Sequence, residues 1–180
     1  MYSRWNTIGT TGFDTYFSRL TEIIFPEFEL FTGVTAVGSN SSSTDSGWAN
    51  KRIKINMPTS IKNFKHKVFT NCNFYAQDKL VISANAVASG YSFQNVTTLT
   101  DIIFTAKVFS EFTGYYIYQG TSANIVFPNA TAVPPAASNM GTPTGSIYVP
   151  DALVDSWKAA SNWSRLAAKI KPLSQWPNLV

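Results

Sequence analysis

The sequence predicts a repeat solenoid, built mainly from short parallel β-strands with irregular or short helical returns and closed by C-terminal helices. Three observations predict it. Short β-prone segments recur at nearly constant spacing, one phrase is repeated between two of them, and the residues after 150 change to a helical pattern. With 180 residues the chain is long enough for one domain with a sizeable core, but not for two.

The strand-like segments are apolar runs that often stop at a proline. The runs end at positions 26, 58, 83, 105, 128 and 150, so the successive differences are 32, 25, 22, 23 and 22. Four of these five intervals fall inside the roughly 20–29 residues of leucine-rich repeats. Stacked turns of this length bury a continuous core and pair their strands in parallel, so a leucine-rich-repeat-like solenoid is expected.

The longest interval contains a polar insertion at 39–50. This stretch is rich in serine and has no apolar periodicity, which predicts a surface loop. Trp48 stands in the insertion and is interpreted either as an anchor for a partner or as a plug into the side of the solenoid. The chain therefore divides into a lead-in or attachment segment at 1–19, the solenoid at 20–150 and a helical cap at 151–180.

A phrase of Phe-x-Asn followed by a small apolar residue occurs twice, at 69–72 and at 93–96. Its six positions are Phe69, Asn71, Cys72, Phe93, Asn95 and Val96. The two phenylalanines are expected to stack in the core on neighbouring turns. The two asparagines are expected to hydrogen-bond backbone groups that the bend of a solenoid leaves without partners. The stretch 108–122 lacks this phrase.

The C-terminal cap is predicted to contain two helices. Asp151 follows a proline and is expected to be the N-cap of a helix over 152–161, whose apolar stripe includes Trp157. After Trp163, a second short helix is expected over 164–171. Because the last turn of a solenoid exposes the edge of its core, these helices are predicted to cover that edge.

The composition favours a protein that acts at a surface. Charged residues make up 13% of the chain, about half of the roughly 25% of an average soluble protein, and aromatic residues make up 14%. Ser, Thr, Asn, Gly and Tyr must therefore cover much of the surface, and these side chains hydrogen-bond to sugars and proteins. The net charge of +4 comes mainly from lysine-rich clusters at 51–54 and 62–67. They are interpreted as a solvated face, with anionic polysaccharide or nucleic acid as the alternative; no nucleic-acid-binding motif accompanies them, so no nucleic-acid partner is expected.

The sequence does not predict an enzyme. Cys72 is the only cysteine and His66 the only histidine, so Cys72 is expected to be a small buried hydrophobe and no metal-ligand cluster is expected. Glu27 and Glu29 share a face if that stretch is extended, but such pairs occur in any strand. We therefore expect no catalytic residue, no cofactor and no metal site. No run of 18 apolar residues occurs, so no membrane span is expected, and if Met1 is the native start the chain carries no export signal of its own.

A run of tyrosines between two glycines is the main candidate for a binding surface. If this stretch is a strand with Ile117 pointing inward, Tyr116 and Tyr118 are exposed on one face and Tyr115 lies on the other face beside Ile117. Exposed tyrosines stack well on sugars and are common in protein interfaces. The alternative is that some of these tyrosines pack between the turns of the solenoid.

Several stretches resemble the BspA-type leucine-rich repeats of gut and oral bacteria and their phages. The family's turn reads roughly strand, Pro, x, Ser, Val or Ile, and then Ala or Phe-x-x-Cys. Met-Pro-Thr-Ser-Ile at 57–61 followed by Phe-Thr-Asn-Cys at 69–72 is similar to it, and so is 93–99, with Val in place of Cys. The stretches 145–163 and 170–174 resemble the closing segment of such proteins.

The resemblance implies recognition rather than catalysis. We expect a non-enzymatic virion surface protein of a bacteriophage, a fibre or a capsid or tail decoration, that binds a host-surface glycan or protein. It would assemble with other virion proteins in the host cytoplasm. The alternatives are a bacterial cell-surface adhesin fragment of the same class and, third, a glycan-degrading enzyme. Because the ends of a solenoid expose unpaired strand edges, a homo-oligomer is also expected, with a trimer as in many fibres.

Overall fold

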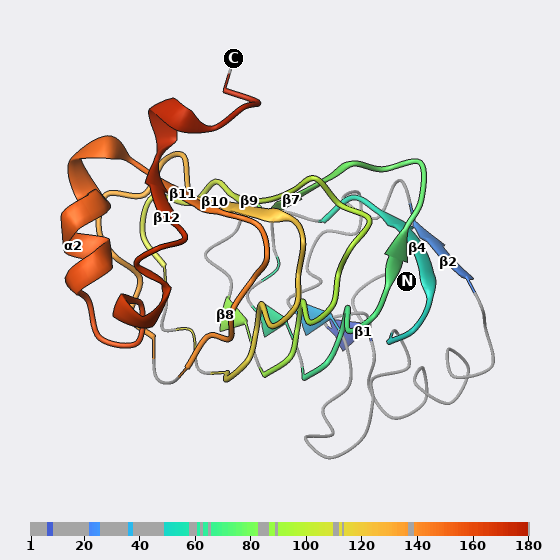
Figure 1. Cartoon of the computed structure of the whole chain (residues 1–180). Coiled ribbons are helices and arrows are strands. Elements are labelled where there is room, and N and C mark those ends of the chain that lie inside the picture. Colours follow the sequence, from blue (N-terminus) through green and yellow to red (C-terminus); the bar gives the residue numbers. More distant parts are fainter. Residues whose placement is uncertain are drawn as a thin grey trace.

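Each turn of the chain contributes short strands to parallel sheets, and the turns stack into a β-solenoid of about five turns with little helix (Figure 1). This confirms the predicted repeat solenoid. The computed structural model describes residues 7–8, 22–25, 36–37, 49–57, 61, 63–64, 66–82, 87–88, 90–109, 112, 114–136 and 139–179.

A five-stranded parallel sheet contains the repeat that the sequence spacing predicts. In the order β12-β11-β10-β9-β7, its strands are β12 (Ile170–Pro172), β11 (Ile147–Val149), β10 (Asn124–Val126), β9 (Asp101–Phe104) and β7 (Lys79–Ile82). The register aligns one buried residue from each strand, namely Leu80, Ile102, Ile125, Ile147 and Ile170. These five aligned residues therefore all belong to one core.

A three-stranded parallel sheet comes before it along the solenoid. Its strands, in the order β2-β4-β6, are β2 (Glu22–Phe25), β4 (Arg52–Ile55) and β6 (Asn73–Phe74). Between β6 and β7 the chain kinks at Ala76, which has a φ of 49°. The Gln77 side chain accepts a bond from the Ile55 N–H at 3.0 Å and donates to the Ile55 carbonyl at 2.8 Å, in place of a neighbouring strand. This kink lengthens the turn, which accounts for the interval from 58 to 83 being longer than those that follow it.

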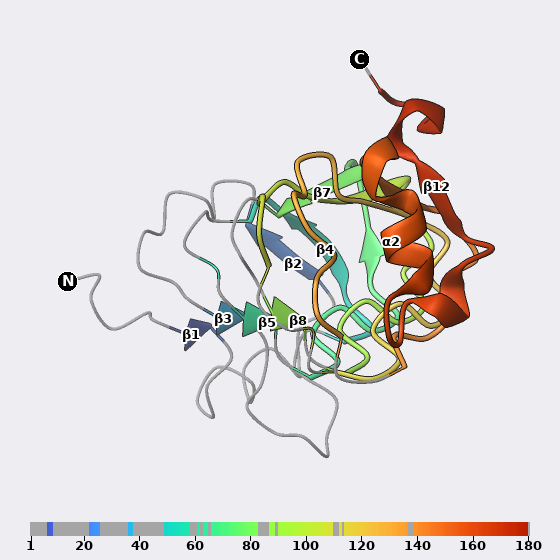
Figure 2. The ribbon, with the colours of Figure 1, turned by 90° about the vertical axis from the view of Figure 1, so that its left-hand side faces the viewer.

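A four-stranded parallel sheet follows another side of the solenoid, with its strands in one row in Figure 2. Its strands, in the order β1-β3-β5-β8, are β1 (Thr7–Ile8), β3 (Ala36–Val37), β5 (Asn63–Phe64) and β8 (Val87–Ala88). An isolated parallel bridge joins Phe112 to Ala136 further along the chain. Since β1 pairs with β3, the solenoid begins inside the segment 1–19 that the sequence assigned to a lead-in.

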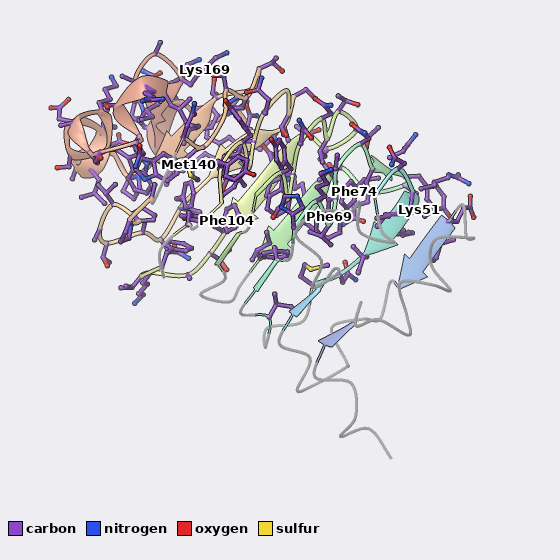
Figure 3. The ribbon with its side chains drawn as sticks, turned by 90° about the horizontal axis from the view of Figure 1, so that it is seen from below. Lys51, Phe69, Phe74, Phe104, Met140 and Lys169 are labelled. Carbon is purple, nitrogen blue, oxygen red and sulfur yellow. The ribbon has the colours of Figure 1, made fainter. Side chains whose placement is uncertain are left out.

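Aromatic rings stack between the sheets. Phe69 lies on Phe93 with 5.6 Å between ring centroids, and Phe93 lies on Tyr118 with 6.1 Å. Phe104 and Phe127 form a second stack at 5.1 Å. All five side chains are fully buried, and burial of each phenylalanine contributes about 1.5–3 kcal/mol to stability. The predicted stacking of Phe69 on Phe93 is confirmed, and Figure 3 shows Phe69 and Phe104 among the side chains that fill the body.

The C-terminal cap contains one α-helix, three short 3-10 helices and a strand rather than the two predicted helices. Besides β12, its elements are the 3-10 helix η2 (Asp151–Leu153), α2 (Val154–Ala159) and the 3-10 helices η3 (Ser164–Leu166) and η4 (Leu173–Gln175). The first predicted helix, at 152–161, thus forms over part of its length. The second predicted helix, at 164–171, is wrong. η3 ends at Leu166, and the chain then pairs with β11 as the strand β12, beside which the Ile147 N–H donates to the Lys169 carbonyl at 2.8 Å.

Two tryptophans fix the cap on the core, as the sequence predicts for a cap over the open edge. Trp157 and Trp163 are fully buried with their rings 5.6 Å apart, and they lie 5.2 and 6.1 Å from Phe127. The Trp163 indole N–H donates to the Pro134 carbonyl at 2.7 Å. The cap is therefore continuous with the aromatic core of the solenoid.

Asp151 does not cap the helix that follows it. No side-chain hydrogen bond caps η2 or α2, and the Asp151 carboxylate instead accepts a bond from the Ser174 N–H at 3.0 Å. Hydrogen bonds from the side chain and backbone of Ser174 hold the pKa of this carboxyl below its usual value. The predicted N-cap is thus corrected to a link between η2 and the tail after β12.

That tail covers the outer face of β9, β10 and β11. Ile103, Val126 and Tyr148 form a cluster separate from the main core, and Leu173 and Trp176 pack against it. Strands that are covered on both faces lose the alternation of buried and exposed residues, and β9 and β11 are buried at every position.

Asp101 binds the end of this tail. Its carboxylate is fully buried and accepts hydrogen bonds from Asn124 Nδ2 at 3.1 Å, Trp176 Nε1 at 3.0 Å and Asn178 Nδ2 at 2.7 Å. Asn124 belongs to the adjacent strand, whereas Trp176 and Asn178 are 75 and 77 residues away. Because a buried carboxylate destabilises a protein unless it is hydrogen-bonded, Asp101 and the tail depend on each other.

Candidate recognition site

Three successive turns stack with the same backbone pattern on one corner of the solenoid. N–H groups at 67, 69 and 71 donate to carbonyls at 90, 92 and 94 at 2.9–3.0 Å, and N–H groups at 91, 93 and 95 donate to carbonyls at 115, 117 and 119 at 2.9–3.1 Å. This register places Tyr118 beside Phe93 and Gly120 beside Asn95. The stretch 108–122 lacks the repeated phrase in its letters, as noted from the sequence, but Tyr118-Gln119-Gly120 occupies the equivalent place on this turn.

One column of residues on these turns has left-handed backbone and side chains suited to it. Asn50, Asn71 and Asn95 have φ of 61°, 55° and 53°, and Gly120 has 70°. Asn95 Nδ2 donates to Asn71 Oδ1, and Asn71 Nδ2 donates to Asn50 Oδ1, both at 2.9 Å. We call these four residues the asparagine column. The prediction that Asn71 and Asn95 bond the backbone of the turn is corrected, because their side chains bond each other.

Glycine ends the asparagine column for a steric reason. A Cβ at position 120 would overlap the side-chain oxygen of Asn95. Gly120 therefore both adopts the left-handed conformation and leaves room for the carboxamide of the preceding turn.

A second column on the same turns has left-handed backbone at residues unsuited to it. Lys67, Tyr91 and Tyr116 have φ of 55°, 58° and 52°. Bulky residues with a Cβ rarely adopt this conformation, which costs about 1–2 kcal/mol per residue. We call these three residues the strained column.

Aromatic side chains gather around the strained column. Tyr91 is at the centre, with ring centroids 5.5 Å from His66, 5.3 Å from Tyr115 and 5.7 Å from Tyr116. Tyr115 and Tyr116 are 49% and 40% exposed, and Tyr91 and His66 are partly exposed. We call these four residues the aromatic ridge. The Lys67 ammonium lies 6.0 Å from the Tyr91 ring, so a cation stands beside the ridge.

The structure divides the predicted tyrosine group differently from the sequence. The segment is a turn rather than a strand, so Ile117 and Tyr118 are both fully buried while Tyr115 and Tyr116 are exposed. The predicted exposure of Tyr118 is wrong, because its ring stacks on Phe93 in the core. Within the described part of the chain its hydroxyl has no hydrogen-bond partner, and burial raises its pKa.

Sequence reasoning missed Tyr91, His66 and Lys67 as site residues. A signal for Tyr91 existed, since Tyr-x-Phe-Gln at 91–94 and Tyr-x-Tyr-Gln at 116–119 are the same pattern one turn apart. Aligning these two phrases places Tyr91 and Tyr116 on neighbouring turns. A signal for Lys67 existed too, because Lys67 precedes Phe69 by two residues just as Tyr91 precedes Phe93. His66 is opposite Gly90 in that alignment and has no matching letter.

The remaining predicted site residues have structural positions or lie outside the described residues. Cys72 and Val96 are buried at equivalent places in their turns. Burial raises the pKa of the Cys72 thiol to about 12, so this residue is a buried hydrophobe as expected. Trp48 lies outside the described residues, as do Glu27 and Glu29.

No protein-family model, curated protein or solved structure matches the chain. Fold and surface alone define its class, which is a β-solenoid with a strained, partly exposed aromatic ridge on one corner. Among the residues that the structure describes, no helix is long and apolar enough to cross a membrane. In the same part of the chain no three His, Cys, Asp or Glu side chains are grouped so that they could hold a metal ion.

Proposed function

We propose that this chain is a non-enzymatic recognition module that binds a surface glycan at the aromatic ridge. The observation that carries the proposal is the contrast between the two left-handed columns. Both columns lie on the same stacked turns, but one is filled by Asn and Gly and the other by Lys and Tyr.

The contrast supports a role for the ridge beyond folding. The turn accepts asparagine in the left-handed position, as Asn50, Asn71 and Asn95 demonstrate, so the same residue at 91 and 116 would be less strained. Strain of this kind is found mainly at functional sites, where the side chain is needed in spite of its backbone. Tyr91 and Tyr116 are therefore the residues that we assign to binding.

Glycan fits the chemistry of the ridge better than an apolar partner. Tyrosine has an apolar ring face that can stack on the C–H face of a sugar, and a hydroxyl that can bond the sugar's own hydroxyls. The ridge consists of three tyrosines and one histidine, all of which have polar atoms. The low charge of the whole chain, 13%, is consistent with a ligand bound by stacking and hydrogen bonds.

For the biological setting, we propose a bacteriophage virion surface protein, in a fibre or a decoration of the capsid or tail, with other virion proteins as partners. The alternative is a bacterial cell-surface adhesin of the BspA-like leucine-rich-repeat class. The five-stranded sheet adds one parallel strand per turn, and the length of those turns lies within the roughly 20–29 residues of leucine-rich repeats. This spacing supports a leucine-rich-repeat type of turn in either case.

Glycan-array binding by the full chain tests the proposed activity. We expect retention of at least one glycan, its loss in Tyr116→Asn, and its persistence in Tyr75→Thr, which removes a tyrosine outside the ridge. Equal binding by wild type and Tyr116→Asn would contradict the assignment of the ridge. New reducing ends released from a bound glycan would contradict the non-enzymatic part of the proposal.

Quantitative mass spectrometry tests the setting. Purified virions are compared with the outer-surface fraction of uninfected host cells. Fixed stoichiometry in virions is the expected result, whereas enrichment on uninfected cells would favour the adhesin. Light scattering tests the homo-oligomer, including the trimer, and a monomer at micromolar concentration would exclude it.

A further inference from the structure

The aromatic ridge has a direction, because its residues come from three successive turns. His66 and Lys67 lie on the first turn, Tyr91 on the second, and Tyr115 and Tyr116 on the third. Backbone bonds join the turns in this order, from the Lys67 N–H to the Gly90 carbonyl at 3.0 Å and from the Tyr91 N–H to the Tyr115 carbonyl at 3.1 Å. The ridge therefore runs along the axis of the solenoid.

Its aromatic rings repeat at a spacing close to that of a linear sugar chain. From one turn to the next, ring centroids are 5.5 Å apart between His66 and Tyr91, and 5.3 and 5.7 Å apart between Tyr91 and the two tyrosines of the third turn. These distances are comparable with the length of one pyranose unit in an extended glycan. A glycan that lies along the axis can thus place one sugar on each turn.

The described charge on the turns of the ridge is positive. At the described positions 66–67, 90–95 and 114–120, these turns contain Lys67 and no Asp or Glu. Lys67 is the member of the strained column on the first turn, and its ammonium lies 6.0 Å from the Tyr91 ring. A lysine held in an unfavourable conformation beside tyrosines suggests a ligand that combines an anion with sugar rings.

We propose that the ligand is a linear acidic glycan, which lies along the solenoid axis with one sugar unit per turn. This inference rests on the proposed glycan-binding function. A carboxylate of the glycan meets the Lys67 ammonium, and the two following sugars stack on Tyr91 and on Tyr116, whose rings are tilted by 37° to each other. Binding of this kind requires at least three consecutive sugars.

Titration calorimetry with two matched ligand series tests the inference. One series contains oligomers of mannuronate, galacturonate and glucuronate from the monomer to the hexamer, and the other contains their methyl esters, which keep the sugar chain and lose the charge. We expect an acidic oligomer to bind the full chain at least about tenfold more tightly than its ester. Affinity should rise from the monomer to the trimer and then level off.

Substitutions that tolerate the left-handed backbone provide the controls. Lys67→Asn is expected to weaken binding of the acidic oligomer about tenfold, to the level of its ester, while thermal unfolding shows that the variant is folded. Lys158→Gln removes one positive charge from α2, away from the ridge, and should leave the affinity unchanged. Equal losses in both lysine variants would mean binding by net charge alone and would overturn the inference.

Two further outcomes separate this inference from the function on which it rests. If neutral glycans bind as tightly as acidic ones, or monomers as tightly as trimers, the acidic linear ligand is wrong while glycan binding at the ridge stands. If no glycan of the array or of either series binds, both proposals fail together.

Discussion

Substitutions at Asn71 measure the two contributions that the asparagine column makes to stability. The Asn71 side chain donates to Asn50 and accepts from Asn95, both at 2.9 Å on an exposed surface, and each bond contributes about 0.5 kcal/mol. Alanine at a φ of 55° adds a penalty of about 1 kcal/mol. We therefore expect Asn71→Ala to lower the free energy of unfolding by about 2 kcal/mol. Asn71→Gly loses the bonds without the penalty and should lower it by about 1 kcal/mol.

Urea denaturation followed by circular dichroism measures these changes, with the slope against urea unchanged between variants. Asn73→Ala is the matched control, since Asn73 is also exposed and is not among the described residues with positive φ. Its effect should stay within about 0.5 kcal/mol. Equal losses in Asn71→Ala and Asn71→Gly would mean that left-handed backbone carries no penalty on this turn. That result would remove the physical basis for treating Lys67, Tyr91 and Tyr116 as strained.

Four further predictions concern three buried groups. Tyr118→Phe should raise the free energy of unfolding by about 1 kcal/mol, because it removes a buried hydroxyl without a partner among the described residues; a loss of stability in urea would reveal a partner. Asp101→Asn should lower the free energy of unfolding by about 1.5–3 kcal/mol and speed amide hydrogen exchange at 173–179. The reason is that the NH₂ group of the new asparagine would face one of the N–H donors that now bond the carboxylate. Unchanged exchange would contradict this. The Cys72 thiol, with its pKa raised to about 12 by burial, should react with thiol reagents only as fast as the protein unfolds, and rapid labelling at pH 8 would count against its burial. Because the unfolded thiol ionises near its ordinary pKa of 9.0 and the folded one keeps its proton, stability should also fall as the pH rises above 9.0.

The strands of the five-stranded sheet could largely be predicted because each inward position repeats an apolar residue. β12 was missed because Ile170 is its only apolar residue and is followed by lysine and proline, so its strand conformation comes from pairing with β11. The four-stranded sheet was missed for a related reason. Its very short strands have no alternation to detect, and only the stacking of turns defines them.

The site was predictable in part. Tyr115 and Tyr116 stood out because they are adjacent and flanked by glycine, but Tyr118 was placed on the wrong side because a strand alternates and this turn does not. The phrases at 69–72 and 93–96 give the register between their turns, but no letter pattern signals left-handed backbone at Lys67 or Tyr91. The contacts of Asp101 with Trp176 and Asn178 span 75 and 77 residues, and no local pattern indicates them.

The tail bound by Asp101 also gives the chain an order of assembly. Neighbouring strands of the five-stranded sheet pair across a single turn of the chain, so the stack can grow turn by turn. The tail, in contrast, can dock only after β9, β10 and β11 lie side by side, and during synthesis it leaves the ribosome after all of them. Until then Ile103, Val126 and Tyr148 form a wet apolar stripe on the finished sheet. The last residues of the described chain thus keep this stripe from water, and a chain cut before Trp176 is expected to expose part of it and to leave Asp101 without two of its three hydrogen-bond donors.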